Sequence, residues 1–194
     1  MSPTNADPEA SIRERLSAAD ARGAAEIAVR AYGPSIYGYV AAVVRDEAGA
    51  GDVFSAFCED LWRGIASFRG DSSFKTWAYR LAWHASLRWL RDPYRRRGAR
   101  LATDDAERLA HEVRSTTALH LKAAARDVLA DVRATLAPEE QALLTLRIDR
   151  DLSWSEIASI LGDGAASEPT LRKRFERLKE KIRREAVARG LLPA

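Results

Sequence analysis

Apolar residues recur three and four positions apart along almost the whole chain, and this pattern constrains the fold more than any other feature. No run of alternating Val, Ile or Thr is long enough for a strand. Prolines and glycines divide the pattern into helical stretches. We expect helices over roughly 12–44 (with a break at 33–34), 53–67, 74–91, 118–136, 138–148, 154–161 and 168–188. The sequence therefore predicts an all-α protein.

Capping residues indicate where several of these helices begin. Asp52 is expected to cap the helix from residue 53, and Ser72 or Ser73 the helix that ends at Arg91. Residues 153–156, Ser-Trp-Ser-Glu, have the pattern of a capping box. Pro138 suits the first turn of a further helix.

Composition excludes several classes of protein. With 194 residues, 46% hydrophobic and 30% charged, the chain can bury a core as one medium domain or two small ones. No apolar run reaches the roughly 18–20 residues that span a bilayer, and residues 1–16 do not resemble a secretory signal. The single cysteine, Cys58, excludes an internal disulfide and any multi-cysteine zinc site, and we expect it to be a small buried hydrophobic residue. These features favour the cytoplasm and give no indication of membrane insertion.

The positive charge is concentrated in two blocks. The net charge is +3, but residues 69–100 carry +7 and residues 170–184 carry +6, so the remainder carries −10. Two basic blocks on an otherwise acidic chain indicate two places that meet a polyanion, although two solvated helix faces would give the same pattern.

The second block lies in a helix-turn-helix pattern, in which a short helix, a glycine-containing turn and a basic helix follow one another. Its apolar stripe is predicted to pack inward and consists of Leu171, Phe175, Leu178 and Ile182. The residues that remain are polar or cationic and suit base edges and phosphates. The turn over residues 162–170 is long for this motif.

The first block mixes flat rings with cations. Residues 68–97 hold seven aromatic side chains and eight Arg or Lys. Unpaired bases stack on such rings, at roughly 1–3 kcal/mol per base, while the cations follow the backbone. We expect Trp77, Trp83 and neighbouring Arg residues to share one exposed helical surface, with other rings in the core. Core packing alone and an amphipathic membrane helix are the alternatives.

These residues resemble a known family. Residues 52–92 look like the σ2 domain of bacterial sigma-70 family factors of the small extracytoplasmic-function type, and residues 136–183 look like the matching σ4 domain. The motifs are an Asp-led helix ending in LW, then FRGDSSFKTWAYRLA, then LSWSEIASILG. The resemblance implies two helical domains: a tail and the start of the first helix over 1–20, a σ2-like domain over 21–93, a linker over 94–117 and a σ4-like domain over 118–194.

The resemblance also implies a function. An alternative sigma factor would bind core RNA polymerase through its β′ and β subunits, recognise promoter DNA and initiate transcription, without being an enzyme and without a cofactor or metal. The residues implied in polymerase binding are Asp52, Ser55, Glu59 and Asp60. Those implied at the minus-ten element are Arg69, Asp71, Ser72, Ser73, Lys75, Trp77, Arg80, His84, Arg88 and Arg91. Those implied at the minus-thirty-five element are Ser167, Thr170, Arg172, Lys173, Arg174 and Arg177. An anti-sigma partner is expected by resemblance alone.

Some positions depart from the family pattern. Ser55 and Ala56 stand where Gln and Glu are common, His84 where many members have Asn, and Arg88 where they often have Asp. These changes leave the minus-ten specificity open. In the linker, the acidic pair at residues 104–105 could mimic nucleic acid, or the segment could be a plain tether.

Three other classes compete with this interpretation. A two-domain helix-turn-helix regulator would bind duplex DNA without polymerase and would not need the block of rings and cations. An enzyme is disfavoured because His84, His111 and His120 form no metal or catalytic motif. An interaction module that touches no DNA would not need the basic last helix.

Overall fold

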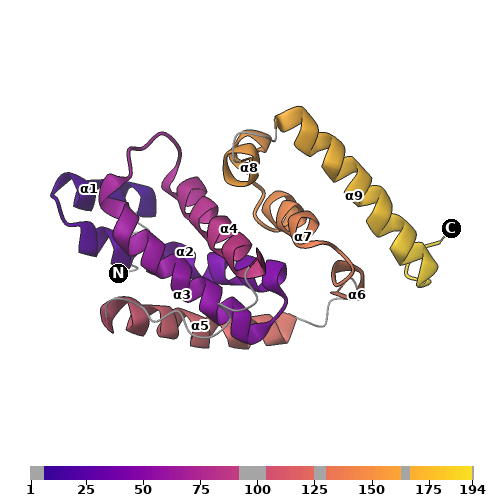
Figure 1. Cartoon of the computed structure of the whole chain (residues 1–194), viewed down its shortest axis with the longest axis horizontal. Helices are drawn as coiled ribbons and strands as arrows, with labels where there is room; N and C mark the ends of the chain where they lie inside the picture. The colour runs from indigo at the N-terminus through magenta and orange to yellow at the C-terminus, as the bar shows by residue number, and fades with distance from the viewer. Residues whose placement is uncertain (1–6, 92–103, 125–129, 163–166, 194) are drawn as a thin grey trace, which may run out of the picture.

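The computed structural model describes residues 7–91, 104–124, 130–162 and 167–193, and its regular elements are all helical (Figure 1). In chain order they are α1 (Pro8–Ser17), α2 (Ala21–Val44), α3 (Glu47–Gly64), η1 (Ile65–Ser67), α4 (Phe74–Arg91), α5 (Asp104–Ala124), α6 (Ala130–Arg133), α7 (Pro138–Leu144), the π-helical turn η3 (Thr145–Asp149), α8 (Trp154–Leu161) and α9 (Glu168–Ala188). The predicted all-α fold is confirmed.

Helix α2 forms the centre of the first helical unit and contacts α1, α3, α4 and α5. Its inward side chains meet aromatic rings of the neighbouring helices. Phe54 lies 5.4 Å from the Tyr37 ring, edge to face, and Tyr39 lies at the same distance from Tyr79. Complete burial of each such side chain contributes about 1.5–3 kcal/mol. This core holds α3 and α4 side by side and so sets which of their faces stay open.

Helices α7, α8 and α9 form the second unit. Leu171, Phe175 and Leu178 are buried as predicted, together with Ile157 and Ile160 of α8. The fourth residue of the predicted stripe, at position 182, is half-buried. The stripe thus turns the opposite side of α9 outward.

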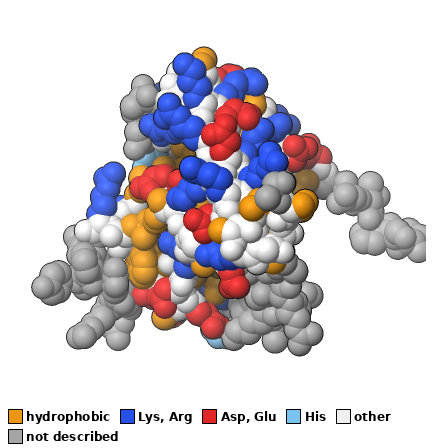
Figure 2. Space-filling model, turned by 90° about the vertical axis from the view of Figure 1, so that its right-hand side faces the viewer, with side chains coloured by type: hydrophobic (Ala, Val, Ile, Leu, Met, Phe, Trp, Pro, Cys, Tyr) orange, Lys and Arg blue, Asp and Glu red, His pale blue; other side chains and the backbone are white. Residues whose placement is uncertain are grey.

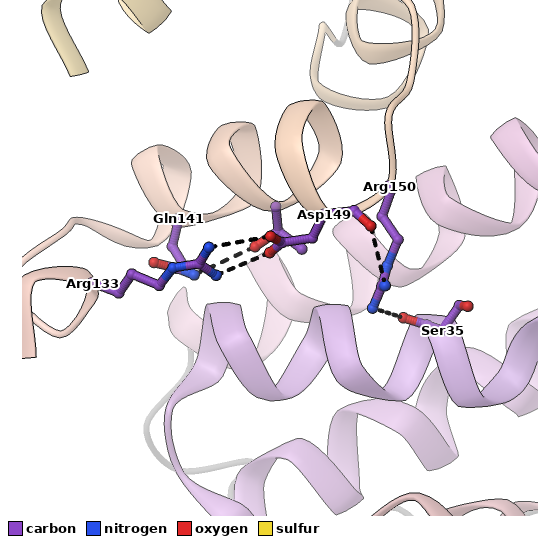
Figure 3. A network of polar contacts seen from close by, with 6 residues as sticks. Ser35, Arg133, Gln141, Asp149 and Arg150 are labelled. Carbon is purple, nitrogen blue, oxygen red and sulfur yellow. Dashed lines mark hydrogen bonds and ion pairs between the residues drawn. The ribbon is translucent and has the colours of Figure 1, made fainter. Parts of the chain in front are cut away.

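The two units pack on one another. Helix α8 lies against α4 (Figure 1), and α7 lies against α2. The buried side chains of both units form one continuous cluster. Across this contact the Arg150 guanidinium donates a hydrogen bond of 2.9 Å to the Ser35 carbonyl (Figure 3). Beside it, Arg133 holds Asp149 through two hydrogen bonds of 3.0 and 3.1 Å.

Two predicted helix boundaries before α4 are wrong. Helix α3 begins at Glu47 rather than after Asp52, because the Asp46 carboxylate accepts the Gly49 N–H at 2.6 Å and caps the helix there. Gly49 therefore lies inside α3 and does not break it. A Cβ at this position would lie 2.2 Å from the Trp89 ring, so glycine allows that close approach. The stretch expected over 12–44 breaks at Ala18–Asp20 instead of at 33–34.

The end of the predicted linker is a helix, and the helix expected over 118–136 is wrong at both ends, since α5 covers Asp104–Ala124 and α6 covers Ala130–Arg133. Helix α5 packs on α2 and α3 through Leu109, Ala110 and Val113, which are buried. Residues 104–117 resemble a linker in sequence because only one narrow side of this helix is apolar. The predicted domain boundary after residue 117 falls inside α5, and the side chains at residues 104–105 lie outside the described part.

Several predicted caps are confirmed. Ser73 accepts the Thr76 N–H at 3.0 Å at the start of α4. The capping box at α8 is complete, since Ser153 accepts the Glu156 N–H at 3.3 Å and the Glu156 carboxylate accepts the Ser153 N–H at 2.8 Å. Cys58 is fully buried as expected, and burial raises the pKa of its thiol to about 12.

Glu156 provides a test of this packing. Burial alone would raise its pKa, but hydrogen bonds from Ser153 and Thr76 outweigh it and hold the pKa below the ordinary 4.5. The stabilisation is therefore present above pH 4.5 and is lost as pH falls through the folded-state value. At pH 7 we expect Glu156→Gln to lower the free energy of unfolding by about 1 kcal/mol, because a neutral amide accepts weaker hydrogen bonds than a carboxylate. Urea titrations should show this difference shrinking below pH 4.5.

Glu180→Gln is the matched control for this substitution, because Glu180 is exposed on α9. It should show no such difference at either pH. A Glu156→Gln penalty that stays constant from pH 7 to pH 3 would contradict the assignment.

Candidate nucleic-acid and polymerase interfaces

One side of the molecule is formed by α9, which carries the cations predicted for the minus-thirty-five element; Arg174 and Arg177 also line a hollow between α9 and α7. Four of them are exposed: Arg172, Lys173, Arg174 and Arg177. Ser167, the N-cap residue, is also exposed, and Thr170 is half-buried with its hydroxyl 3.0 Å from that of Ser167. Figure 2 looks onto this side of the molecule and shows Lys and Arg gathered at its upper part. The structure therefore brings this whole predicted set together.

Arg172 is held at the start of α9 by two contacts. Its guanidinium lies 5.2 Å from the centroid of the Trp154 ring, and Glu168 pairs with it at 3.5 Å. Trp154 in turn packs edge to face on Phe175, with the ring centroids 5.5 Å apart. The helix-turn-helix core thus holds the Arg172 side chain in place at the start of α9.

Helix α4 has three different sides. One side enters the core of the first unit through Phe74, Ala78 and Ala82, which are buried. A second side lies against the helix-turn-helix unit, where Thr76 donates to the Glu156 carboxylate at 3.3 Å. The third side is open and carries predicted minus-ten residues that are half-buried or exposed: Trp77, Arg80, His84, Arg88 and Arg91. Lys75 is half-buried in the first turn, where its charge acts on Glu156 of α8.

Trp77 and Trp83 do not share an exposed surface in this arrangement. Trp77 is half-buried, and its ring packs 5.4 Å from Phe68 and 5.2 Å from Phe74. Trp83 is only 4% exposed and lies on the side of α4 that faces α7, α8 and α9. The expectation of one open surface for both rings is wrong here, because the second unit packs over Trp83.

The loop before α4 is open to solvent. Arg69, Asp71 and Ser73 are exposed, and Arg69 pairs with Asp71 at 3.1 Å. Gly70 has a φ of 78°, which glycine adopts without strain. A hollow of about 560 Å³ separates this loop from α1 and is lined by Arg13, Leu16, Phe68, Arg69 and Gly70 among others. The loop leads directly into α4, whose open side begins with Trp77 and Arg80.

Three of the four residues predicted to bind polymerase line one hollow between α3 and α4. Asp52, Glu59 and Asp60 meet there with Arg88 and Trp89 around a volume of about 250 Å³. Asp60 pairs with Arg88, and Glu59 pairs with Arg63 at 2.5 Å. Arg88, a residue predicted for the minus-ten element, thus lies between the predicted polymerase-binding surface and the predicted minus-ten surface.

Ser55 lies apart from these acids. It is buried, and its hydroxyl accepts a hydrogen bond of 2.5 Å from Arg114 of α5. Burial raises the pKa of Asp52, although the Arg114 charge opposes this effect. Helix α5 therefore covers one side of α3, while the acidic hollow opens on the other.

Sequence reasoning missed four residues that join distant elements: Glu9, Tyr32, Arg114 and Arg150. Glu9 accepts the Tyr32 hydroxyl proton at 3.3 Å and two backbone N–H groups of α4. Burial, and then the Glu9 charge, raise the pKa of Tyr32. No local motif marks such residues, because their partners are far away along the chain.

Two negative findings apply to the part of the chain that the structure describes. No helix there is both long and apolar enough to cross a bilayer. No three His, Cys, Asp or Glu side chains gather there in a way that could hold a metal ion.

Comparison with known proteins shows which family this chain is similar to. Residues 28–97 match the family model described as Sigma-70 region 2. The chain is 30% identical over 190 residues to the RNA polymerase sigma-H factor of Pseudomonas aeruginosa, covering 93% of this chain and 92% of that protein. It is 31% identical over 100 residues to the RNA polymerase sigma factor YlaC of Bacillus subtilis, covering 51% of this chain and 57% of YlaC. Because the first of these alignments spans both units, the chain belongs to the sigma-70 family of RNA polymerase sigma factors.

Proposed function

We propose that this chain is an alternative sigma factor of the extracytoplasmic-function type, which binds core RNA polymerase, recognises promoter DNA and starts transcription. The observation that supports it best is the pairing, in one sigma-70 family chain, of an outward cationic α9 with an open loop and helix at residues 68–91. It is expected in the cytoplasm with the polymerase, without catalytic activity of its own.

Helix α9 is proposed to read the minus-thirty-five element as duplex DNA. Its buried stripe leaves Arg172, Lys173, Arg174 and Arg177 exposed, and Ser167 stands at its N-terminus. A helix with cations on its outer side fits the major groove, about 12 Å wide, with its first residues at base edges and its cations at phosphates. Arg can bind guanine through two hydrogen bonds, and Lys can neutralise phosphate.

The loop over residues 68–73 and the open side of α4 are proposed to hold the opened minus-ten strand. Trp77 and Arg80 are accessible for stacking and for phosphate contact in the present arrangement. Trp83 lies beneath the helix-turn-helix unit, so it could meet a base only after α8 has left α4. The minus-ten contact is therefore assigned first to the loop, Trp77 and Arg80.

The acidic hollow between α3 and α4 is proposed to dock on the β′ subunit. Asp52, Glu59 and Asp60 supply negative charge next to Trp89, a combination that suits a basic helical partner. Contact of the second unit with the β subunit and control by an anti-sigma factor rest on the family resemblance alone. A regulator that binds duplex DNA without polymerase is not favoured, since the sigma-factor alignment covers 93% of the chain.

Transcription in a purified system tests the proposal. The protein mixed with a cognate core polymerase and genomic templates should give transcripts with discrete 5′ ends that core enzyme alone does not produce. Mapping those ends defines the promoter. Retention of the same templates without polymerase, together with no new start sites, would favour the duplex-binding regulator.

The charge on α9 makes the duplex contact testable. Changing Arg172 and Lys173 to Ala should weaken holoenzyme binding to the mapped promoter and reduce the slope of log K against log salt by about 1–2, because each phosphate contact contributes about 0.9. The matched control changes Arg183 and Arg184, which are exposed later on the same helix. Equal slopes for the two double variants would mean that the start of α9 is not on DNA.

Trp77 tests the minus-ten assignment. Trp77→Ala should reduce promoter opening, measured by permanganate reactivity, by about tenfold, the loss of one stacked base. Trp77→Leu keeps apolar contact with Phe68 and Phe74 but removes the flat ring, so it should fold normally by circular dichroism and still open poorly. Full opening by the Leu variant would assign Trp77 to the core alone.

A further inference from the structure

The N-terminus of α4 is completed by a residue from the other end of the first unit. The first four N–H groups of a helix have no partner within the helix. Here the Phe74 and Lys75 N–H groups each donate to the Glu9 carboxylate at 2.9 Å. The Thr76 N–H donates to the Ser73 hydroxyl at 3.0 Å and the Trp77 N–H to the Ser73 carbonyl at 3.1 Å. All four donors are therefore satisfied, two of them by Glu9 of α1.

Glu9 is itself held in place. Its carboxylate also accepts the Tyr32 hydroxyl at 3.3 Å, and the Tyr32 ring stacks on Phe74 with the centroids 6.0 Å apart. Helix α1 is anchored to α2 by Ile12, which is 0% exposed. A negative charge at a helix N-terminus is also favourable for the helix dipole. Glu9 thus connects α1, α2 and the first turn of α4 through one side chain.

This connection fixes the end of the loop over residues 68–73. The loop enters α4 at Ser73, directly before the two N–H groups that Glu9 accepts. At its other end Phe68 packs on Phe74, with ring centroids 5.2 Å apart. The exposed residues between these anchor points include Arg69 and Asp71. The shape of the loop therefore depends on where the first turn of α4 is held.

We infer that Glu9 is a positioning residue for capture of the opened minus-ten strand, because it holds the first turn of α4 and with it the loop that meets DNA. The inference rests on the proposed function of that loop. Both Glu9 oxygens accept hydrogen bonds from protein donors, so Glu9 acts through the loop rather than on DNA. A loop held in its binding conformation loses less entropy when the strand binds.

The test compares single-stranded with duplex binding. Holoenzyme is titrated with a fluorescent non-template oligonucleotide carrying the minus-ten sequence of the mapped promoter, and separately with the duplex minus-thirty-five fragment. Glu9→Gln puts an NH₂ group against a backbone N–H and removes the charge. We expect it to weaken oligonucleotide binding about tenfold and to leave duplex and core polymerase binding unchanged. Amide hydrogen exchange at Phe74 and Lys75 should be faster in this variant.

Glu14→Gln is the matched control, because Glu14 is exposed on the same helix and the substitution removes the same charge. It should bind the oligonucleotide like the original protein. If Glu9→Gln also binds like the original, or loses duplex and oligonucleotide affinity equally, the positioning role is overturned.

A second variant covers the case in which Glu9→Gln does not fold. Tyr32→Phe removes only the hydroxyl that donates to Glu9 and should weaken oligonucleotide binding two- to threefold; unchanged binding by a folded protein would overturn the inference. The proposed function fails separately, when the original protein gives no new transcript start sites with core polymerase.

Discussion

The packing of α4 decides what the rest of the molecule can do. One side of this helix must fill the core beside α2, so Phe74, Ala78 and Ala82 are unavailable to any ligand. A second side carries Trp83 and lies under the helix-turn-helix unit. Only the third side, with Trp77 and the cations beside it, is left open. The assignment of minus-ten residues follows from this division.

The contact between the two units combines apolar burial with buried polar groups. Arg150 crosses from the second unit to the Ser35 carbonyl (Figure 3). Burial raises the pKa of Tyr79, against the opposing effect of the Arg150 charge. Buried polar contacts of this kind contribute less net stability than apolar packing of the same size, since each group loses water on burial. The Arg150–Ser35 bond therefore contributes less to the stability of this contact than the apolar packing beside it.

The proposed DNA-binding and polymerase-binding surfaces carry opposite charges. Cations lie outward on α9, while Asp52, Glu59 and Asp60 gather in the hollow between α3 and α4. The ion pair between Arg88 and Asp60 joins the acidic hollow to the open side of α4. A single substitution at Arg88 would consequently affect both the proposed polymerase contact and the proposed minus-ten contact.

The sequence by itself determined those features that depend on residues close together along the chain. Helical spacing, the Ser153 and Ser73 caps, and the stripe at Leu171, Phe175 and Leu178 depend on residues only a few positions apart. Tertiary structure alone decided the burial of Trp83, the covering of Ser55 by α5 and the bond from Glu9 to the start of α4. Each of these joins residues far apart along the chain, and helical periodicity carries no information about which helix faces which.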